Sequence, residues 1–328
     1  MTQPIDFVIT WVDNNDPSWR ADYLKYSGRT DDDSIRYRDW DNLRFWFRGV
    51  EKFAPWVNKI FFITCGHVPE WLNVDAPKLR VICHSDYMDG QYLPTFSSHP
   101  IEFCLHRIEG LSDRFVYFND DTFLINDVKP TRFFVDGLPC DMAILSPMFI
   151  GGMHGHTVYN ALDIINTFFK KRTVIKENPL KWFHPQYGTY LIRNLFDVGY
   201  SYFTGFYDHH LPQGYLKESF EDAWKHNRNS FEDTCSHRFR CQDDVCIWVM
   251  RYWQLATGRF HPLNLTNDSK YFLTNDVNVD EVSHVISSQR KNVIVINDSL
   301  ELNDFEKAKK VINQAFMKIL PDKSSYEL

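Results

Sequence analysis

A pair of adjacent carboxylates directly follows an apolar run in the first half of the chain. Asn119, Asp120 and Asp121 come after residues 114–118, RFVYF. A strand that ends in this way places oxygen atoms at the edge of a sheet. Mg²⁺ prefers oxygen ligands and often shares them with substrate phosphates. Asn-Asp-Asp is also common in ordinary turns. The motif therefore predicts either a cation site, for Mg²⁺ with Mn²⁺ as a substitute, or a structural turn.

Two further apolar runs end in carboxylates. One covers residues 5–12 and leads to Asp13, and the other covers residues 292–296 and leads to Asp298. In doubly wound sheets ligands bind in the crevice beyond the carboxyl ends of the strands. We therefore expect both carboxylates to converge with the central acidic pair, with Asp120, Asp121 and Asp298 as metal ligands.

A histidine close to a proline is the candidate general base. His210 lies two residues before Pro212. A turn fixed by proline can hold an imidazole in one orientation, and an imidazole titrates near neutral pH. A single histidine can equally be a structural residue, so both interpretations stay open. Lys217, shortly after the turn, could steady a phosphate or an acceptor.

Arginine side chains could bind phosphate through paired donors. Arg240 precedes a predicted helix over residues 243–257, and the N-terminus of that helix would favour an anion. The alternative is simple capping by the acidic residues there. A second basic run contains Arg36 and Arg38.

Strands that alternate with helices predict an α/β fold with a doubly wound, mostly parallel sheet. After residue 130 the sequence becomes more helical and aromatic. We expect a single domain over residues 1–328, in which the half 131–328 closes back onto the α/β half 1–130. The predicted strands are 5–12, 59–64, 79–83, 114–118 and 292–296, the predicted helices are 42–53, 100–111, 159–170, 182–196, 243–257 and 303–320, and 20–35 is predicted to be a loop.

Composition excludes several classes of protein. Hydrophobic residues make up 44% of the chain, so a large core can form. The net charge is −7 and no long basic block occurs, which argues against nucleic acid as a partner. No signal peptide and no run of about 18 apolar residues is recognisable. These features predict a cytoplasmic protein or a soluble fragment of a longer one.

Seven cysteines indicate reduced thiols. Their number is odd and most lie in apolar segments, which does not suit a disulfide framework. A zinc site among Cys235, His237, Cys241 and Cys246 is the less favoured alternative, because the spacings match no common zinc pattern.

The segment 303–320 has apolar residues along one helical face and Lys307, Lys309 and Lys310 among its polar ones. A helix packed on the domain is the favoured interpretation. The alternative is peripheral contact with a membrane surface, at its inner face.

Four separated blocks resemble the Stealth family of sugar-1-phosphate transferases, which includes bacterial capsular polysaccharide phosphotransferases and the catalytic core of an animal GlcNAc-1-phosphotransferase. The blocks occur in the family's order and span nearly the whole chain. They are residues 5–19, 36–64 with 93–121, 209–218 with 240–244, and 292–298.

The resemblance implies a nucleotide-sugar-transferase-like (GT-A-like) fold, an Mg²⁺-dependent reaction and a nucleotide-diphosphate sugar donor, for which a UDP-sugar is expected. The acceptor would be an oligosaccharide or a lipid-linked glycan. Transfer of a hexose-1-phosphate or N-acetylhexosamine-1-phosphate to its hydroxyl would form a phosphodiester in capsule or cell-surface polysaccharide. The implied catalytic residues are His210, Arg240, Asp13 and Lys217, and the implied substrate contacts are Trp11, Arg36, Arg38, Ser97, Ser98 and Asn119.

Two other functions stay open at this point. A conventional metal-dependent glycosyltransferase, which forms a glycosidic bond, would use a similar acidic site. A glycan-binding module without catalysis would use the ten Trp and sixteen Tyr side chains to stack on sugar rings.

Overall fold

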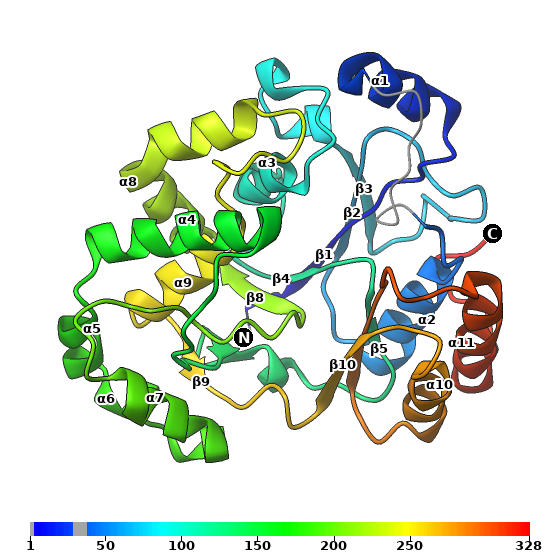
Figure 1. The fold of residues 1–328 in the computed structure, drawn as a ribbon. Coiled ribbons are helices and arrows are strands. Elements are labelled where there is room, and N and C mark those ends of the chain that lie inside the picture. Colours follow the sequence, from blue (N-terminus) through cyan, green and yellow to red (C-terminus); the bar gives the residue numbers. More distant parts are fainter. Residues whose placement is uncertain (1–2, 29–37) are drawn as a thin grey trace.

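The protein is described here by a computed structural model, which covers residues 3–28 and 38–328. Its centre is a five-stranded sheet of order β3-β2-β1-β4-β8, in which all strands but β8 run parallel (Figure 1). The predicted α/β fold with a mostly parallel sheet is confirmed. The strands of this sheet are β1 Asp6–Thr10, β2 Ile60–Thr64, β3 Leu79–Cys83, β4 Arg114–Phe118 and β8 Gln213–Leu216.

A second sheet brings the end of the chain back to the acidic pair. It has the order β10-β11-β5, with β10 Ser269–Leu273 parallel to β11 Val293–Asn297 and β11 antiparallel to β5 Thr122–Leu124. The Ile296 N–H donates to the backbone oxygen of Asp121 at 2.9 Å. This pairing sets the C-terminal end of β11 beside the C-terminal end of β4.

Helices cover both faces of the central sheet (Figure 1). The short strands β6 Phe134–Val135, β7 Leu138–Asp141 and β9 His261–Pro262 form a third, small sheet. One continuous buried cluster contains residues of both halves of the chain. The helices are α1 Pro17–Ser27, α2 Leu43–Phe53, α3 Ser98–Phe103, α4 Gly152–Phe168, α5 Lys171–Glu177, α6 Pro179–Trp182, α7 Leu191–Asp197, α8 Lys217–Ser236, α9 Trp248–Ala256, α10 Val279–Ser288 and α11 Phe305–Ile319.

The predicted loop over 20–35 is wrong in its first part, because α1 continues to Ser27, and its last part, 29–35, lies outside the described residues. Asp16 caps this helix by accepting from the Trp19 N–H at 2.8 Å, and Pro17 occupies its first position. Tyr23 of α1 packs edge-on against Phe96. The buried aromatic residues of this otherwise polar segment pack the helix against the rest of the protein.

Three predicted helices are shorter than expected. The segment 182–196 is broken at Gly188, which has a φ of +58° that other residues rarely adopt, so that only α7 remains as its last part. The helix predicted over 100–111 ends at Phe103. The one predicted over 243–257 begins at Trp248, five residues late. The structure also contains the long helix α8, which the sequence did not predict.

The C-terminal helix α11 packs on the domain, as the favoured prediction had it. Its apolar face, which includes Ile312 and Phe316, is buried, and Phe316 stacks on Phe45 at 5.3 Å. This face is therefore not available to a membrane. Among the helices formed by residues 3–28 and 38–328, none has the length and apolar character needed to cross a bilayer.

The seven cysteines all lie within the described residues and are free thiols, as predicted. Four of them, including Cys104 and Cys235, are buried.

Candidate active site

A cleft of about 690 Å³ lies beyond the carboxyl ends of β1 and β4. The structure therefore brings together residues that are far apart in the sequence, such as Asp13 and Asp298, which are separated by 285 positions. Arg36 lies outside the described residues. The predicted residues that line the cleft are Trp11, Asp13, Arg38, Ser97, Ser98, Asn119, Asp120, Asp121, His210, Arg240 and Asp298.

Negative charge accumulates at the end of β4. Asp120 is open to the water of the cleft, but protein surrounds it closely. The surrounding protein displaces much of the water around Asp120, and this is the main reason why its pKa lies above the ordinary value. The negative charge of Asp121 is the second reason. Asp298 approaches from β11, and burial likewise raises its pKa. Its Oδ2 atom is buried without a hydrogen-bond partner, while Oδ1 lies 3.6 Å from Arg38 Nη1. Positive charge would stabilise both carboxylates.

The oxygen atoms present fit a magnesium ion that is shared with a substrate. Within residues 3–28 and 38–328, no three Asp, Glu, His or Cys side chains are grouped closely enough to hold a metal on their own. Mg²⁺ is commonly bound by one or two carboxylates, with phosphate and water oxygens as the remaining ligands. Asp121 and Asp120 could supply the first kind of ligand, and a diphosphate could supply the second. The metal ligands stay a prediction.

His210 points its ring at this acidic end. Its Nε2 lies 3.3 Å from Asp121 Oδ2 and 3.4 Å from Asn119 Nδ2. Burial alone would lower the pKa of His210, but the hydrogen bond and the charge of Asp121 outweigh it and raise the pKa. An imidazole beside carboxylates at the edge of a cleft can accept a proton from a hydroxyl group bound there.

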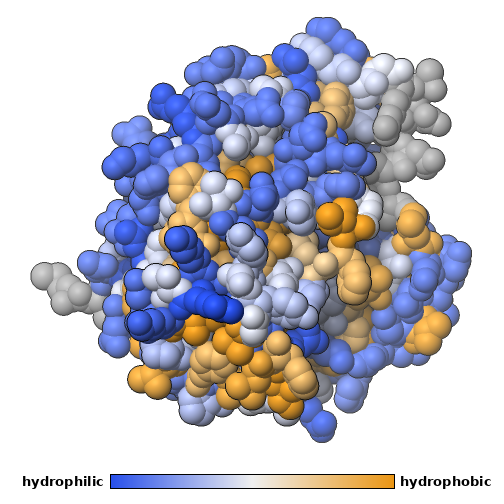
Figure 2. All heavy atoms as spheres, turned by 60° about the vertical axis from the view of Figure 1, so that its left-hand side comes forward, coloured by the Kyte–Doolittle hydropathy of each residue, from blue (hydrophilic) through white to orange (hydrophobic). Residues whose placement is uncertain are grey.

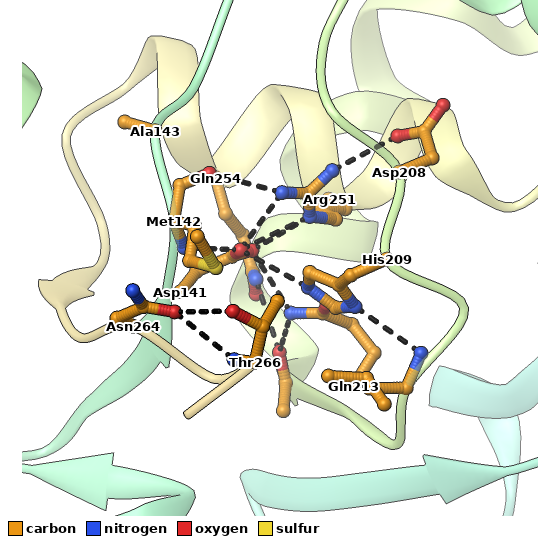
Figure 3. Close-up of polar contacts among 12 residues, drawn as sticks. Asp141, Met142, Ala143, Asp208, His209, Gln213, Arg251, Gln254, Asn264 and Thr266 are labelled. Atoms are coloured by element: carbon orange, nitrogen blue, oxygen red, sulfur yellow. Dashed lines mark hydrogen bonds and ion pairs between the residues drawn. The ribbon is translucent and has the colours of Figure 1, made fainter. Parts of the chain in front are cut away.

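The backbone of His210 is unusual, with a φ of +49°, in the left-handed region that non-glycine residues rarely occupy. Residues on both sides of it are anchored to one buried ion pair, between Arg251 and Asp141 (Figure 3). Before the histidine, Asp208 accepts from Arg251 Nη1 at 2.9 Å. After it, Gln213 Nε2 donates to Asp141 Oδ2 at 3.1 Å. These anchors over-determine the loop and support its strained conformation.

The neighbouring His209 is structural. It is buried, its Nε2 lies 3.4 Å from Asp141 Oδ1, and its Nδ1 accepts from the Leu211 N–H at 3.2 Å. Burial, followed by the charge of Arg251, lowers the pKa of His209 to about 4. The two adjacent histidines thus have opposite environments, and only His210 opens into the cleft.

Arg240 reaches the cleft from a turn and not from the start of a helix. Its Nη2 donates to Ser98 Oγ at 3.0 Å. The turn is held by the buried Asp244, whose Oδ2 accepts from the Cys241 N–H at 2.9 Å. The predicted contribution of a helix dipole is therefore wrong, because α9 begins only at Trp248. The side chain of Asp244 does the positioning.

Asp244 also joins two histidines. Its Oδ2 lies 3.0 Å from His99 Nδ1, and its Oδ1 lies 2.7 Å from His237 Nδ1. His99 belongs to α3 and lines the cleft. The contact ties the turn that carries Arg240 to the helix that carries its partner Ser98.

Lys217 does not line the cleft. Because β8 runs antiparallel to β4, its last residue, Leu216, pairs with Arg114 at the beginning of β4. Lys217 follows at the opposite edge of the sheet, where its Nζ lies 3.4 Å from the Ile108 backbone oxygen. The predicted contact of Lys217 with phosphate or acceptor has no support in this geometry.

Asp13 and Trp11 form the wall of the cleft at the end of β1. The Asp13 N–H donates to His67 Nε2 at 2.7 Å, and Trp11 packs on the same imidazole with ring centroids 5.3 Å apart. The Asp13 carboxylate accepts from the Asn15 N–H at 2.8 Å, which shapes the acidic turn. A donor contact of Asp13 stays a prediction.

Sequence reasoning missed a buried acid in the cleft, Glu102 of α3. Burial raises its pKa, and its Oε1 accepts from the Tyr117 hydroxyl at 3.1 Å. Tyr117 lies 3.0 Å from Thr10 Oγ1, so a chain of hydrogen bonds crosses from α3 through β4 to β1. Glu102 lies within an apolar segment that was predicted to be a helix, and an acid in such a segment was the available signal.

Comparison with known proteins gives a consistent result. Residues 3–31 match Stealth protein conserved region 1, and residues 36–140 match Stealth protein conserved region 2. The chain is 39% identical over 332 residues to a protein called capsular polysaccharide phosphotransferase WcwK from Streptococcus pneumoniae, with 99% of this chain and 98% of the relative covered.

Two further relatives have similar names. The receptor polysaccharide phosphotransferase WefC of Streptococcus oralis is 36% identical, with 99% of each chain covered. The exopolysaccharide phosphotransferase cps2G of Lactiplantibacillus plantarum is 35% identical, with 98% of this chain and 96% of the relative covered.

Among solved structures, the galactosyltransferase LgtC in complex with donor and acceptor sugar analogues aligns over 94% of this chain and 95% of its own, with 10% identity and a TM-score of 0.37. Mouse xyloside xylosyltransferase 1 aligns with a TM-score of 0.36 and 10% identity, over 90% of this chain and 98% of its own. Such low scores support no statement about the reaction.

Proposed function

Because the chain belongs to the Stealth family, we propose that it is a polysaccharide phosphotransferase that moves a sugar-1-phosphate from a nucleotide-diphosphate sugar to a glycan hydroxyl. The transferred group would be a hexose-1-phosphate or an N-acetylhexosamine-1-phosphate, the donor a UDP-sugar, and the product a phosphodiester in a capsule or cell-surface polysaccharide. The names of full-length relatives support the phosphotransferase class. A cytoplasmic location stays a prediction.

One arrangement carries the proposal: His210 and Arg240 line the same cleft as the acidic end of β4. Phosphoryl transfer needs positive charge on the non-bridging oxygens of the phosphate and a base for the attacking hydroxyl. The guanidinium of Arg240 and the imidazole of His210 are groups of these two kinds.

The reaction can be written with these residues. The acceptor hydroxyl oxygen attacks the phosphorus atom that carries the sugar, while His210 Nε2 accepts the hydroxyl proton. The bond from that phosphorus to the bridging oxygen of the diphosphate breaks, and the nucleoside monophosphate leaves with its electron pair. Arg240 stabilises the charge that builds up on the phosphate oxygens, and Ser98 holds the guanidinium in place.

Mg²⁺, with Asp121 and Asp120 as its protein ligands, would supply positive charge to the diphosphate. Asp121 would thus bind the metal ion and also contact His210. A bound cation would offset the charge of Asp121, which now raises the pKa of His210.

Phosphorus NMR of the reaction mixture tests the proposal. The protein is incubated with Mg²⁺, a glycan acceptor and, in turn, UDP-GlcNAc, UDP-Gal, UDP-GalNAc, UDP-Glc and GDP-Man. The expected products are a nucleoside monophosphate and a new phosphodiester signal. Release of a nucleoside diphosphate without that signal would instead show a glycosyltransferase, and no nucleotide release from any donor with any acceptor would contradict both enzymes. The His210→Ala variant is the control for a contaminating activity.

A further inference from the structure

Helix α7 presents its apolar side to solvent. Ile192, Leu195 and Phe196 are exposed by 54%, 62% and 82%, whereas its two buried residues are the polar Asn194 and Asp197. A surface helix of a globular protein normally has the opposite arrangement, with apolar residues towards the core. The exposed apolar face therefore needs an explanation.

Buried hydrogen bonds fix this orientation. Asn194 Oδ1 accepts from the Leu145 N–H at 2.7 Å, and its Nδ2 donates to the Ala143 and Trp182 carbonyl oxygens at 2.8 and 2.6 Å. Asp197 forms a buried ion pair with Lys171 at 2.8 Å. Turning the helix over would break every one of these contacts, so the apolar side is held outward.

Neighbouring segments extend the apolar area. Beyond α7, Tyr200 and Tyr202 are exposed. The segment before α4 lies alongside, because the Met148 N–H donates to the Thr204 carbonyl oxygen at 3.3 Å, and the next residue, Phe149, is 91% exposed. We call these residues, with Ile192, Leu195, Phe196 and Ile150, the α7 surface. Figure 2 turns the α5–α7 side forward and shows hydrophobic residues gathered low on that face next to hydrophilic ones.

The charges around the α7 surface are positive. Residues 168–203 contain six Lys or Arg and only two Asp or Glu, in a chain whose net charge is −7. One of these acids, Asp197, is already paired with Lys171. Lys170, Arg172 and Lys176 are exposed on or beside α5. The positive charge is thus concentrated next to the exposed apolar residues, against the sign of the whole protein.

We propose that the α7 surface docks onto a membrane of anionic phospholipids. Apolar and aromatic side chains that enter the headgroup region, next to basic residues that meet anionic lipids, are the features of interfacial binding. Tyrosine suits the boundary between lipid and water. A second copy of this chain is the other occupant that the test below detects.

The position of the α7 surface relative to the cleft suggests where the acceptor glycan comes from, an inference that rests on the proposed function. Phe149 and Ile150 lead directly into α4, whose first turn carries His154 to the cleft. A docked molecule would hold the entrance near His154 close to the bilayer, and an acceptor glycan anchored in that bilayer would reach it without leaving the membrane.

Sedimentation with lipid vesicles tests the docking without any enzymatic step. Wild-type protein is mixed with vesicles of phosphatidylcholine alone or with phosphatidylglycerol added, at low and high salt. We expect binding only to the anionic vesicles, weakened by salt. No binding to anionic vesicles would overturn the proposal, as would equal binding to both kinds.

Two pairs of variants separate the α7 surface from other exposed residues. Leu195→Ser with Phe196→Ser should weaken binding by about tenfold or more, whereas Val74→Ser with Val277→Ser, which changes exposed valines elsewhere, should not. Lys170→Glu, Arg172→Glu and Lys176→Glu together should also weaken it by at least about tenfold. The same charge change on α11, at Lys307, Lys310 and Lys318, should not.

Circular dichroism confirms that each variant is folded, and the charge variant tests the docking independently of the apolar variant. Equal losses of vesicle binding in the α7 variants and in the control variants would contradict the α7 surface as the docking site.

Sedimentation velocity without lipid tests for the other occupant. A wild-type dimer that the Leu195→Ser and Phe196→Ser changes dissociate would show that the surface binds a second copy. Because vesicle binding needs no donor, its failure and the failure of the proposed reaction are observed separately.

Discussion

Arg251 and Asp141 form a fully buried ion pair in which the guanidinium binds both carboxylate oxygens, with Nε–Oδ2 and Nη2–Oδ1 distances of 2.9 Å (Figure 3). The pair joins β7 to α9 and, through Asp208 and Gln213, fixes both sides of the His210 turn. Burial raises the pKa of Asp141, but the charge of Arg251 outweighs it and lowers that pKa to about 2.

Breaking this pair should strongly destabilise the fold. Asp141→Asn keeps the shape of the side chain but leaves the charge of Arg251 buried without its counter-charge, which typically costs about 3–5 kcal/mol. The free energy of unfolding, measured in urea, checks this. Glu177→Gln, at an exposed position, is the control. A loss below about 1 kcal/mol in Asp141→Asn would contradict the role assigned to the pair.

Acid should destabilise the protein through His209. Its folded-state pKa of about 4 lies below the ordinary value of 6.5, so the unfolded chain binds the proton more readily between these values. The stability that depends on the neutral ring is complete above pH 6.5 and is lost as the pH falls towards 4, by roughly 3 kcal/mol at most. Urea unfolding of wild type and His209→Gln from pH 4 to 8 measures it. The difference between their stabilities should change with pH in that window; a constant difference would refute the assignment.

Replacing His210 should affect turnover and not donor binding. A positioned base contributes about 10²–10⁴ in rate, so His210→Ala should lower kcat by that factor while calorimetry finds donor affinity nearly unchanged. In the protein without metal the Asp121 contact raises the pKa of His210, so the titration of its imidazole, followed by NMR in the presence of a chelator, should lie at higher pH than that of an ordinary imidazole. His226→Ala, on the outer side of α8, is the control. Turnover within about threefold of wild type in His210→Ala would exclude the base role.

Arg240 should not be replaceable by lysine. An ammonium group cannot reproduce the forked geometry, and losing a contact to transition-state charge costs about 10²–10³ in rate. We expect a loss of that size in Arg240→Lys and a smaller one in Ser98→Ala, which removes only the 3.0 Å hydrogen bond that holds the guanidinium. Steady-state kinetics measures both, with the exposed Arg228→Lys as control. Wild-type kinetics in Arg240→Lys would rule out contact with the transferring phosphate.

Asp121→Ala should abolish activity and also the dependence of donor binding on Mg²⁺. Calorimetry with a UDP-sugar, with Mg²⁺ and with a chelator, measures the second effect without turnover. In wild type the metal should strengthen binding, because a carboxylate and the diphosphate share it. Asp298→Asn should show a partial effect. If donor binding by wild type were the same in chelator, the carboxylates would have another role.

The sequence by itself determined the strands and the polar residues at their ends, because both depend on residues that are neighbours in the chain. The apolar runs before Asp13, Asp121 and Asp298 predicted three strands, and the rule that ligands bind beyond strand ends correctly predicted that their acids share a cleft. His210 was named as a candidate base from its turn and from the family resemblance, and the structure places it in this cleft. The strength of these predictions comes from residues adjacent to one another, whose pattern directly reflects backbone geometry.

Only the tertiary structure decided which polar residue faces which side. The antiparallel direction of β8 carries Lys217 away from the cleft, although it lies only seven residues after His210. Asp244, and no helix start, positions Arg240. The buried hydrogen bonds of Asn194 hold the polar side of α7 towards the core and its apolar side towards solvent, although the sequence of α7 resembles that of a helix packed through its apolar residues. The direction of a strand and the partner of a buried polar group depend on residues that are far apart in the chain. These residues meet only once the chain has folded. A pattern of neighbouring residues therefore cannot predict which of them will pair.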